Sequence, residues 1–129
     1  EYNSAIALDP DNAYLHVGVA QAYMGNDDLE NTTLALGKAV ELGPEDPYIR
    51  LLLGLAYRDK GSNDLAAREF KAASEYGGLD ILLHVRLESL LKTVGTDDDV
   101  KKQQAKVEEI RALLEERDKA LQSQEQADD

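Results

Sequence analysis

The stretch that decides the fold is PYIRLLLGLAYRDKGSNDLAAREFKAASEYGGLD, residues 47–80. Its apolar residues recur at helical spacing in two blocks, and the motif GSND interrupts them. Pro47 behind Asp46 suits the first turn of one helix, and Ser62 or Asn63 can cap a second helix. No part of the chain alternates with the period of two that β-strands need. The stretch therefore predicts two helices joined by a tight turn.

The first of these helices has more apolar residues than one buried stripe needs, because such a stripe repeats only at i, i+3, i+4 and i+7. At about 100° per residue, the large side chains fall into two opposite sets. One set is Leu53, Ala56 and Tyr57, and the other is Tyr48, Leu51 and Leu55. The apolar run from Leu51 to Tyr57 is far shorter than the roughly 20 residues of a membrane span. We therefore expect one face to build a core and the other to meet a partner.

The chain repeats itself every 34 residues. A shift by this period places residues 13–46 on residues 47–80, with the matched pairs Tyr14/Tyr48, Val19/Leu53, Ala20/Gly54, Ala22/Ala56, Tyr23/Tyr57, Leu36/Phe70, Ala39/Ala73 and Pro44/Gly78. A second shift reaches a third unit, residues 81–114. A backward shift reaches residues 1–12, with Tyr2, Ile6 and Leu8, so we expect the chain to begin inside a repeat, in the second helix of a truncated unit. Such a period predicts a stack of similar units.

The period and the matched positions resemble the tetratricopeptide repeat family, whose units are helix–turn–helix pairs. The second unit fits the family pattern best, with Leu53-Gly54, Tyr57, Ala66, Phe70 and Ala73 at its characteristic positions. The first unit matches with Val19-Ala20, Tyr23, Thr32, Leu36, Ala39 and Pro44. The resemblance implies an all-α, right-handed solenoid of helical hairpins with an extended C-terminal capping helix.

Some positions depart from the family pattern. The position of its tryptophan holds His16, Arg50 and His84 in successive units. In the third unit, Glu88 replaces the small glycine and Gln104 replaces the aromatic residue. We therefore expect the third unit to be a degenerate terminal repeat.

The C-terminal part is predicted to continue as a helix. Thr96 and the three acids that follow it place a hydroxyl cap and negative charge at the positive end of a helix dipole. Residues 115–129 are polar, and we expect a helical extension with a frayed end, because solenoids need polar caps to stay soluble. A coiled coil is the weaker alternative: Val100, Val107, Leu114 and Leu121 have heptad spacing, but the partner positions hold Gln103, Arg117 and Gln124.

In the family, the first helix of each unit lines a concave face, and the resemblance therefore implies a partner-binding groove. Its residues would be Tyr14, Val17, Gln21, Met24, Tyr48, Leu51, Leu55, Arg58, Leu82, Val85, Arg86 and Lys92. Contiguous exposed apolar surface commonly marks a binding site. Two alternatives stay open. In the first, some of these residues, and Leu52 beside them, belong to the core between repeats. In the second, another copy of the chain covers this face.

One subgroup of the family binds the C-terminal carboxylates of chaperones through basic and amide side chains. The equivalent positions here hold Val17, Gln21, Leu52, Leu82 and Arg86, of which only the arginine matches. We therefore expect recognition of an apolar or amphipathic helix in place of a carboxylate clamp.

Composition argues against several classes of function. The net charge is −12 and the pI about 4.5, whereas surfaces that bind nucleic acid or anionic lipid need clustered Lys and Arg. The sequence has no cysteine, which excludes disulfides and thiolate metal sites. We see no leader and no membrane segment, which leaves the compartment open, with the cytoplasm slightly favoured over the periplasm.

We also expect no catalysis, no cofactor and no metal. His16 and His84 occupy equivalent positions two repeats apart, about 20 Å if each helix pair adds about 10 Å, which is too far for one zinc ion. The acids after Thr96 lack the glycine and final glutamate of a calcium loop. No serine has a histidine nearby, in sequence or in repeat geometry, that would form a nucleophile–base pair.

Two functions remain. The first is a protein-interaction module whose concave groove binds an apolar or amphipathic helical segment of another protein or peptide. Acidic residues outnumber basic ones seven to one in residues 11–46 but equal them in residues 47–80, which favours a ligand with its basic end over the first unit. The second is a self-associating scaffold, a homo-oligomer whose repeats stack or swap between chains.

Overall fold

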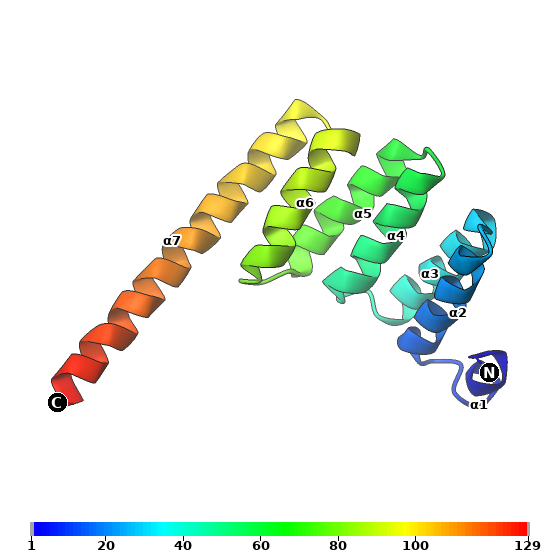
Figure 1. Ribbon diagram of the computed structural model, residues 1–129, viewed down its shortest axis with the longest axis horizontal. Helices are drawn as coiled ribbons and strands as arrows, with labels where there is room; N and C mark the ends of the chain where they lie inside the picture. The colour runs from blue at the N-terminus through cyan, green and yellow to red at the C-terminus, as the bar shows by residue number, and fades with distance from the viewer. Residues whose placement is uncertain (1, 129) are drawn as a thin grey trace.

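The computed structural model describes residues 2–128, with the side chains of residues 4–128. The secondary structure of this part of the chain consists of α-helices without any strand (Figure 1). The helices are α1 (Tyr2–Leu8), α2 (Ala13–Gly25), α3 (Leu29–Leu42), α4 (Pro47–Asp59), α5 (Asn63–Tyr76), α6 (Ile81–Val94) and α7 (Asp97–Asp128). The prediction of an all-α fold is confirmed.

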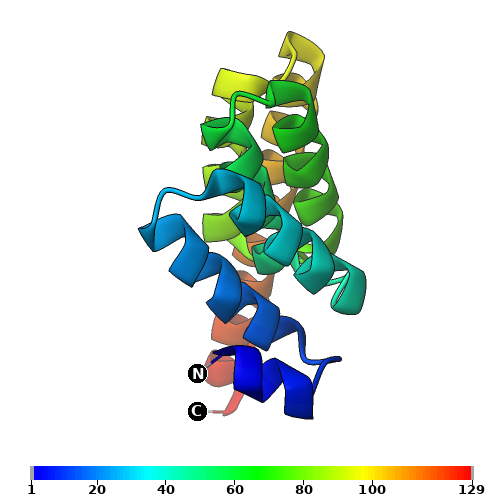
Figure 2. The ribbon, with the colours of Figure 1, turned by 90° about the vertical axis from the view of Figure 1, so that its right-hand side faces the viewer.

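Consecutive helices pair as hairpins: α2 packs against α3, α4 against α5, and α6 against α7. Contacts between α3 and α4 and between α5 and α6 join the hairpins. Figures 1 and 2 show α2, α4 and α6 in one layer and α3 and α5 in a second layer, and Figure 1 shows the two ends of the chain at opposite ends of the stack. The chain is therefore a solenoid of helical hairpins, as the repeat pattern predicts.

The helix caps explain where the helices begin. Asn12 and Asp46 accept hydrogen bonds from backbone N–H groups in the first turns of α2 and α4. Asp99 N donates to Thr96 Oγ1 (3.1 Å), and Thr96 N donates to Asp99 Oδ2 (3.0 Å), which is a reciprocal capping box at the start of α7. Ser62 precedes α5 as expected, but its side chain makes no capping hydrogen bond.

Two clusters of buried side chains form the core. The first joins α2, α3 and α4 and contains Val17, Ala20, Leu36, Ala39, Ile49, Leu53 and Ala56. The second joins α4, α5 and α6 and contains Leu51, Ala66, Ala67, Phe70, Ala73, Leu83, Leu87 and Leu91. Gly54 lets α4 approach α5 closely, because a Cβ at this position would lie 2.5 Å from the Phe70 ring. The small residue and the aromatic residue of the repeat pattern are thus the two sides of one packing contact.

The residues at the family's tryptophan position all bind the same kind of backbone group. Each reaches the carbonyl oxygen six residues earlier: His16 Nε2 lies 3.1 Å from Pro10 O, Arg50 Nε 2.7 Å from Pro44 O, and His84 Nε2 3.0 Å from Gly78 O. These side chains therefore fasten each inter-repeat turn to the helix that follows it, and the departure from tryptophan has a structural explanation.

The last helix, α7, has 32 residues, a length of about 48 Å. Its first half packs on α6 and buries Gln103, Val107 and Ile110. Every residue from Glu115 to Asp128 is exposed, and Figure 1 shows this part projecting beyond the hairpins. The helix continues to Asp128, and the Ala, Gln, Glu and Lys residues of this segment favour helix. Within residues 2–128, no helix combines the length and the apolar character of a membrane span.

Candidate partner-binding groove

The first helices of the three units, α2, α4 and α6, each expose one large side chain at the same position in their first turn. Tyr14, Tyr48 and Leu82 are spaced by 34 residues, and 65%, 51% and 80% of their surfaces are exposed. The other exposed members of the predicted groove are Gln21, Met24, Arg58, Val85, Arg86 and Lys92. The layer formed by α2, α4 and α6 therefore presents a row of large side chains to solvent.

Two predicted groove residues are buried, and for them the prediction is wrong. Val17 belongs to the core cluster of α2, α3 and α4, and Leu51 to the cluster of α4, α5 and α6. Leu55 is half-buried against the second cluster, and Leu52 against the first. The reason is that the flank of a first helix packs against the neighbouring unit, which covers the residues on that flank. Val85, by contrast, is exposed, so it is not part of the core between repeats.

Two residues of the exposed row bind the aspartate that precedes the next first helix. The Tyr14 hydroxyl donates to Asp46 Oδ2 and the Tyr48 hydroxyl to Asp80 Oδ2, so this link recurs with the period of the repeat. Each aspartate also caps the helix that follows: Asp46 accepts from the backbone N–H of Tyr48 (2.9 Å) and Asp80 from that of Leu83 (3.1 Å). The links therefore hold successive first helices in register. They were not predicted, although the recurrence of both residue types at 34 positions was the available signal.

The links also shift the pKa values of both tyrosines and of Asp80. Hydrogen bonding to Asp46 raises the pKa of Tyr14, and hydrogen bonding to Asp80 raises the pKa of Tyr48. The bond from Tyr48, followed by that from the backbone of Leu83, lowers the pKa of Asp80. Both tyrosines therefore stay protonated, and Asp80 stays charged, across the neutral range.

The third position of the row has a different chemistry. Leu82 has no hydroxyl, so it cannot form such a link, and it is the most exposed member of the row. Val85 lies one turn further along α6 on the same face and is also exposed. The row therefore changes from tyrosines held by aspartates on α2 and α4 to free aliphatic side chains on α6.

Basic side chains lie on α4 and α6, toward the later units. Arg58 pairs with Asp59 (3.3 Å) and Lys92 with Glu88 (3.3 Å). Ion pairs between exposed side chains contribute about 0–1 kcal/mol, so a ligand can replace them at little cost. Arg86 is exposed and has no carboxylate within 4 Å among the described residues. These cations are therefore available to an acidic group of a ligand.

We expected no serine near a histidine, and this prediction is wrong. Ser74 Oγ lies 3.3 Å from His84 Nδ1. The contact arises because α5 and α6 pack closely around the turn at Gly78. His84 is fully buried, and burial lowers its pKa, so the imidazole cannot reach a substrate. This serine–histidine contact therefore belongs to the core.

Metal binding was not expected either, and the described part of the chain contains no group of three His, Cys, Asp or Glu side chains that could hold an ion.

Neither a protein-family model nor a curated protein sequence matches the chain. Solved structures of MamA do match. The MamA RS-1 ArsTM double mutant gives a TM-score of 0.68 at 17% sequence identity, over 88% of this chain and 64% of that chain. A crystal structure of MamA protein gives a TM-score of 0.68 at 20% identity, over 86% of this chain and 61% of the other. The chain thus spans less than two thirds of the length of these two chains.

The likeness extends to the MamA R50E mutant, with a TM-score of 0.59 at 21% identity, over 84% of this chain and 80% of that chain. At such low identities the comparison concerns the fold alone. The hairpins, the packing of small against aromatic residues and the structural neighbours agree: the chain is an all-helical, tetratricopeptide-like solenoid with the fold of MamA.

Proposed function

We propose that the chain is a non-catalytic protein-interaction module, and that the layer formed by α2, α4 and α6 binds an amphipathic helical segment of a partner protein. The observation that carries this proposal is the row of Tyr14, Tyr48 and Leu82, one large exposed side chain per repeat. Exposed apolar side chains are usually scattered singly, whereas a regular row of them is typical of a binding surface. A partner helix with one apolar face would cover such a row.

The charges around the row favour one orientation of the partner. The first repeat is strongly acidic, and the free or weakly paired cations Arg58, Arg86 and Lys92 lie on α4 and α6. A partner segment with a basic end over α2 and an acidic end over α6 would match this distribution. Its apolar face would meet Leu82 and Val85 at the acidic end.

The test uses amphipathic helical peptides selected from a display library against the folded protein. The key variant is Leu82→Glu, which places a charge within the proposed apolar contact. The matched control is Leu34→Glu on α3, whose side chain is 63% exposed but lies on the other layer. We expect the selected peptides to bind Leu82→Glu at least about tenfold more weakly than the unchanged protein. They should bind Leu34→Glu as they bind the unchanged protein.

Binding that survives Leu82→Glu but is lost in Leu34→Glu would place the interaction on the layer of α3 and α5 and refute the groove proposal. A selection that yields no binder would count against it as well. Reversing the charges at the two ends of a selected peptide tests the orientation, and the reversed peptide should bind more weakly and associate more slowly.

The second candidate function is self-association, and the projecting part of α7 favours it. Every side chain from Glu115 to Asp128 is exposed, including Leu121, and so is Leu8 on α1 at the other end of the stack. A second copy of the chain could cover such ends. Light scattering over a concentration series tests this function, with Leu121→Glu as the variant. A mass that stays monomeric at the highest concentration would refute it and leave the groove proposal untouched.

A further inference from the structure

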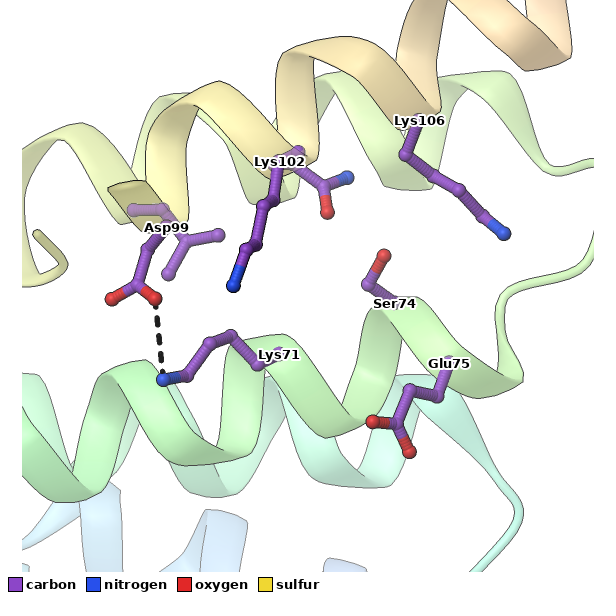
Figure 3. A pocket seen from close by; sticks show the side chains of 8 residues that line it. Lys71, Ser74, Glu75, Asp99, Lys102 and Lys106 are labelled. Carbon is purple, nitrogen blue, oxygen red and sulfur yellow. Dashed lines mark ion pairs between the residues drawn. The ribbon is translucent and has the colours of Figure 1, made fainter. Parts of the chain in front are cut away.

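A cavity of about 290 Å³ lies between α5 and α7, away from the exposed row on α2, α4 and α6. Leu91 of α6 contributes an apolar part of its wall, and the remaining lining comes from the facing sides of α5 and α7. Figure 3 shows the labelled side chains around this space, with Lys102 of α7 and Ser74 of α5 directed into it from opposite sides.

The lining of this cavity is positively charged on a protein with a net charge of −12. Lys71, Lys102 and Lys106 contribute three ammonium groups, against the two carboxylates of Glu75 and Asp99. Like charges around one cavity repel each other, and Asp99 and Asp98 offset two of the three by pairing with Lys71 and Lys102. Lys106 remains without a carboxylate partner among the described residues, and this unpaired cation on a strongly acidic chain points to an anionic ligand.

The three lysines are available to such a ligand. Lys71 pairs with Asp99 (3.3 Å) and Lys102 with Asp98 (3.0 Å), but both lysines are more than half exposed. The pair of Lys102 with Asp98 is exposed on both sides and contributes about 0–1 kcal/mol, and the ammonium group of Lys71 is itself accessible, so both groups can turn to a new anion. Lys106 is exposed beside the cavity and has no carboxylate within 4 Å among the described residues.

Ser74 supplies a fourth hydrogen-bond donor, because two donors face a single acceptor atom of the buried His84. His84 Nε2 lies 3.0 Å from Gly78 O, so this nitrogen carries the proton and Nδ1 is the acceptor. Both Gln103 Nε2 and Ser74 Oγ lie 3.3 Å from Nδ1, which has a single lone pair. Gln103 Nε2 also donates to His84 O (3.0 Å), which fixes the amide in place. Because Gln103 can occupy the single acceptor site of Nδ1, the hydroxyl of Ser74 can turn from Nδ1 and donate into the cavity.

We propose that this cavity binds a phosphate group, held by the ammonium groups of Lys71, Lys102 and Lys106 and by the hydroxyl of Ser74. A phosphate dianion presents more acceptor oxygens and more charge than a carboxylate, and four donors from two helices match it better. The cavity is larger than a bare phosphate ion, so the group would be carried on a small molecule or on a phosphorylated side chain. The site lies outside the groove and does not depend on the partner proposed for it.

The two histidines of the chain make the proposal testable by NMR. Burial and the nearby charge of Lys106 lower the pKa of His84, so an anion beside Lys106 should raise that pKa. The other charged groups that face this part of the core are Asp80 on α6 and Lys102, Lys71 and Glu75 around the cavity. His16 occupies the equivalent position two repeats away and serves as the internal reference.

The experiment titrates the protein with inorganic phosphate and with O-phosphoserine at constant ionic strength set by sodium chloride. We expect a saturable shift of the His84 ring signals with a higher pKa, and no comparable shift at His16. The double variant Lys102→Gln, Lys106→Gln should bind at least about tenfold more weakly. The matched control Lys101→Gln, Lys119→Gln loses the same charge from exposed positions of α7 outside the cavity lining and should bind as the unchanged protein does.

The remaining outcomes separate the sources of the phosphate group. Tighter binding of O-phosphoserine than of inorganic phosphate would support a phosphorylated side chain, and equal binding would support recognition of the phosphate group alone. Succinate serves as the carboxylate comparator, and binding of succinate as tight as that of phosphate would overturn the assignment. An unchanged response in Lys102→Gln, Lys106→Gln, or equal shifts at His84 and His16, would overturn the site itself. Leu82→Glu should leave phosphate binding unchanged.

Discussion

The hairpins α4–α5 and α6–α7 occupy equivalent places in the repeat but are packed differently. In the first, Gly54 lies against the ring of Phe70, which is fully buried. In the second, the equivalent positions hold Glu88 and Gln104, and Gln104 is exposed. Without a glycine, α6 offers no room for an aromatic ring at this position. α7 still buries Gln103 and Val107, the equivalents of Glu69 and Ala73, and it buries Ile110 in addition. The hairpin α6–α7 therefore keeps part of the packing stripe of the repeat but lacks the contact between a glycine and an aromatic ring.

The two hairpins also differ in the polar pair that joins their helices. Arg50 Nη1 lies 3.3 Å from Glu69 Oε2, and both side chains are mostly buried. The residues 34 positions later are His84 and Gln103, which form a neutral pair in the same place, with Gln103 Nε2 donating to His84 O (3.0 Å). The two positions stay paired while the charge is removed, and the donor changes sides: Arg50 donates to Glu69, whereas Gln103 donates to the backbone oxygen of His84. The comparison shows that two positions of the repeat can stay in contact and change their electrostatics.

The largest effect is expected from removing the aromatic side of the contact. Phe70→Ala should lower the free energy of unfolding by about 3–5 kcal/mol, because it leaves a cavity in the core. The matched variant Gln104→Ala changes an exposed residue and should stay within about 0.5 kcal/mol of the unchanged protein. Urea unfolding followed by circular dichroism measures both. Similar losses in the two variants would contradict the difference between the hairpins.

A smaller effect is expected from the polar pairs. Glu69→Ala leaves Arg50 without its carboxylate and should cost about 2 kcal/mol, since hydrogen bonds to charged groups are the stronger kind. Gln103→Ala removes a neutral hydrogen bond and should cost about 1 kcal/mol. The same unfolding experiment compares them. A greater loss in Gln103→Ala would show that the neutral pair is the stronger of the two.

The glycine side of the contact should give a smaller net effect. Gly54→Ala brings a methyl group into the Phe70 ring, an overpacking cost of about 1–3 kcal/mol, but gains up to about 1 kcal/mol of helix propensity. We expect a net loss of about 1 kcal/mol. Glu88→Ala, at the equivalent position, should be close to neutral. A Gly54→Ala variant more stable than the parent would mean that the ring can move away.

The smallest effect concerns pH. Burial holds the pKa of His84 below its usual value of 6.5, so this group stabilises the fold when neutral and stability falls as the pH drops below about 6.5. The lowered pKa values of Asp80 and Asp99 act in the same direction but only near pH 4 and below. Thermal unfolding between pH 7 and pH 5 isolates the histidine. His84→Gln should flatten this dependence, and a slope that persists unchanged in His84→Gln would contradict its assignment to this histidine.

By itself, the sequence determined the helices, their caps and the period of 34, because these depend on residue spacing along one chain. The positions of Asp46, Thr96 and Asp99 at helix starts follow from hydrogen bonds within a few residues. The contact between Gly54 and Phe70 could also be expected, since the repeat pattern pairs a small residue with an aromatic one.

Only the tertiary structure decided which side chains remain free. Leu51 and Tyr48 share one face of the predicted helix, yet Leu51 is in the core and Tyr48 is exposed, because the next hairpin covers one flank of α4 and leaves the other open. The link from Tyr48 to Asp80, at the start of α6, and the contact of Ser74 on α5 with His84 on α6 connect one hairpin to the next. Such contacts depend on the angle at which hairpins stack, and no local spacing encodes that angle.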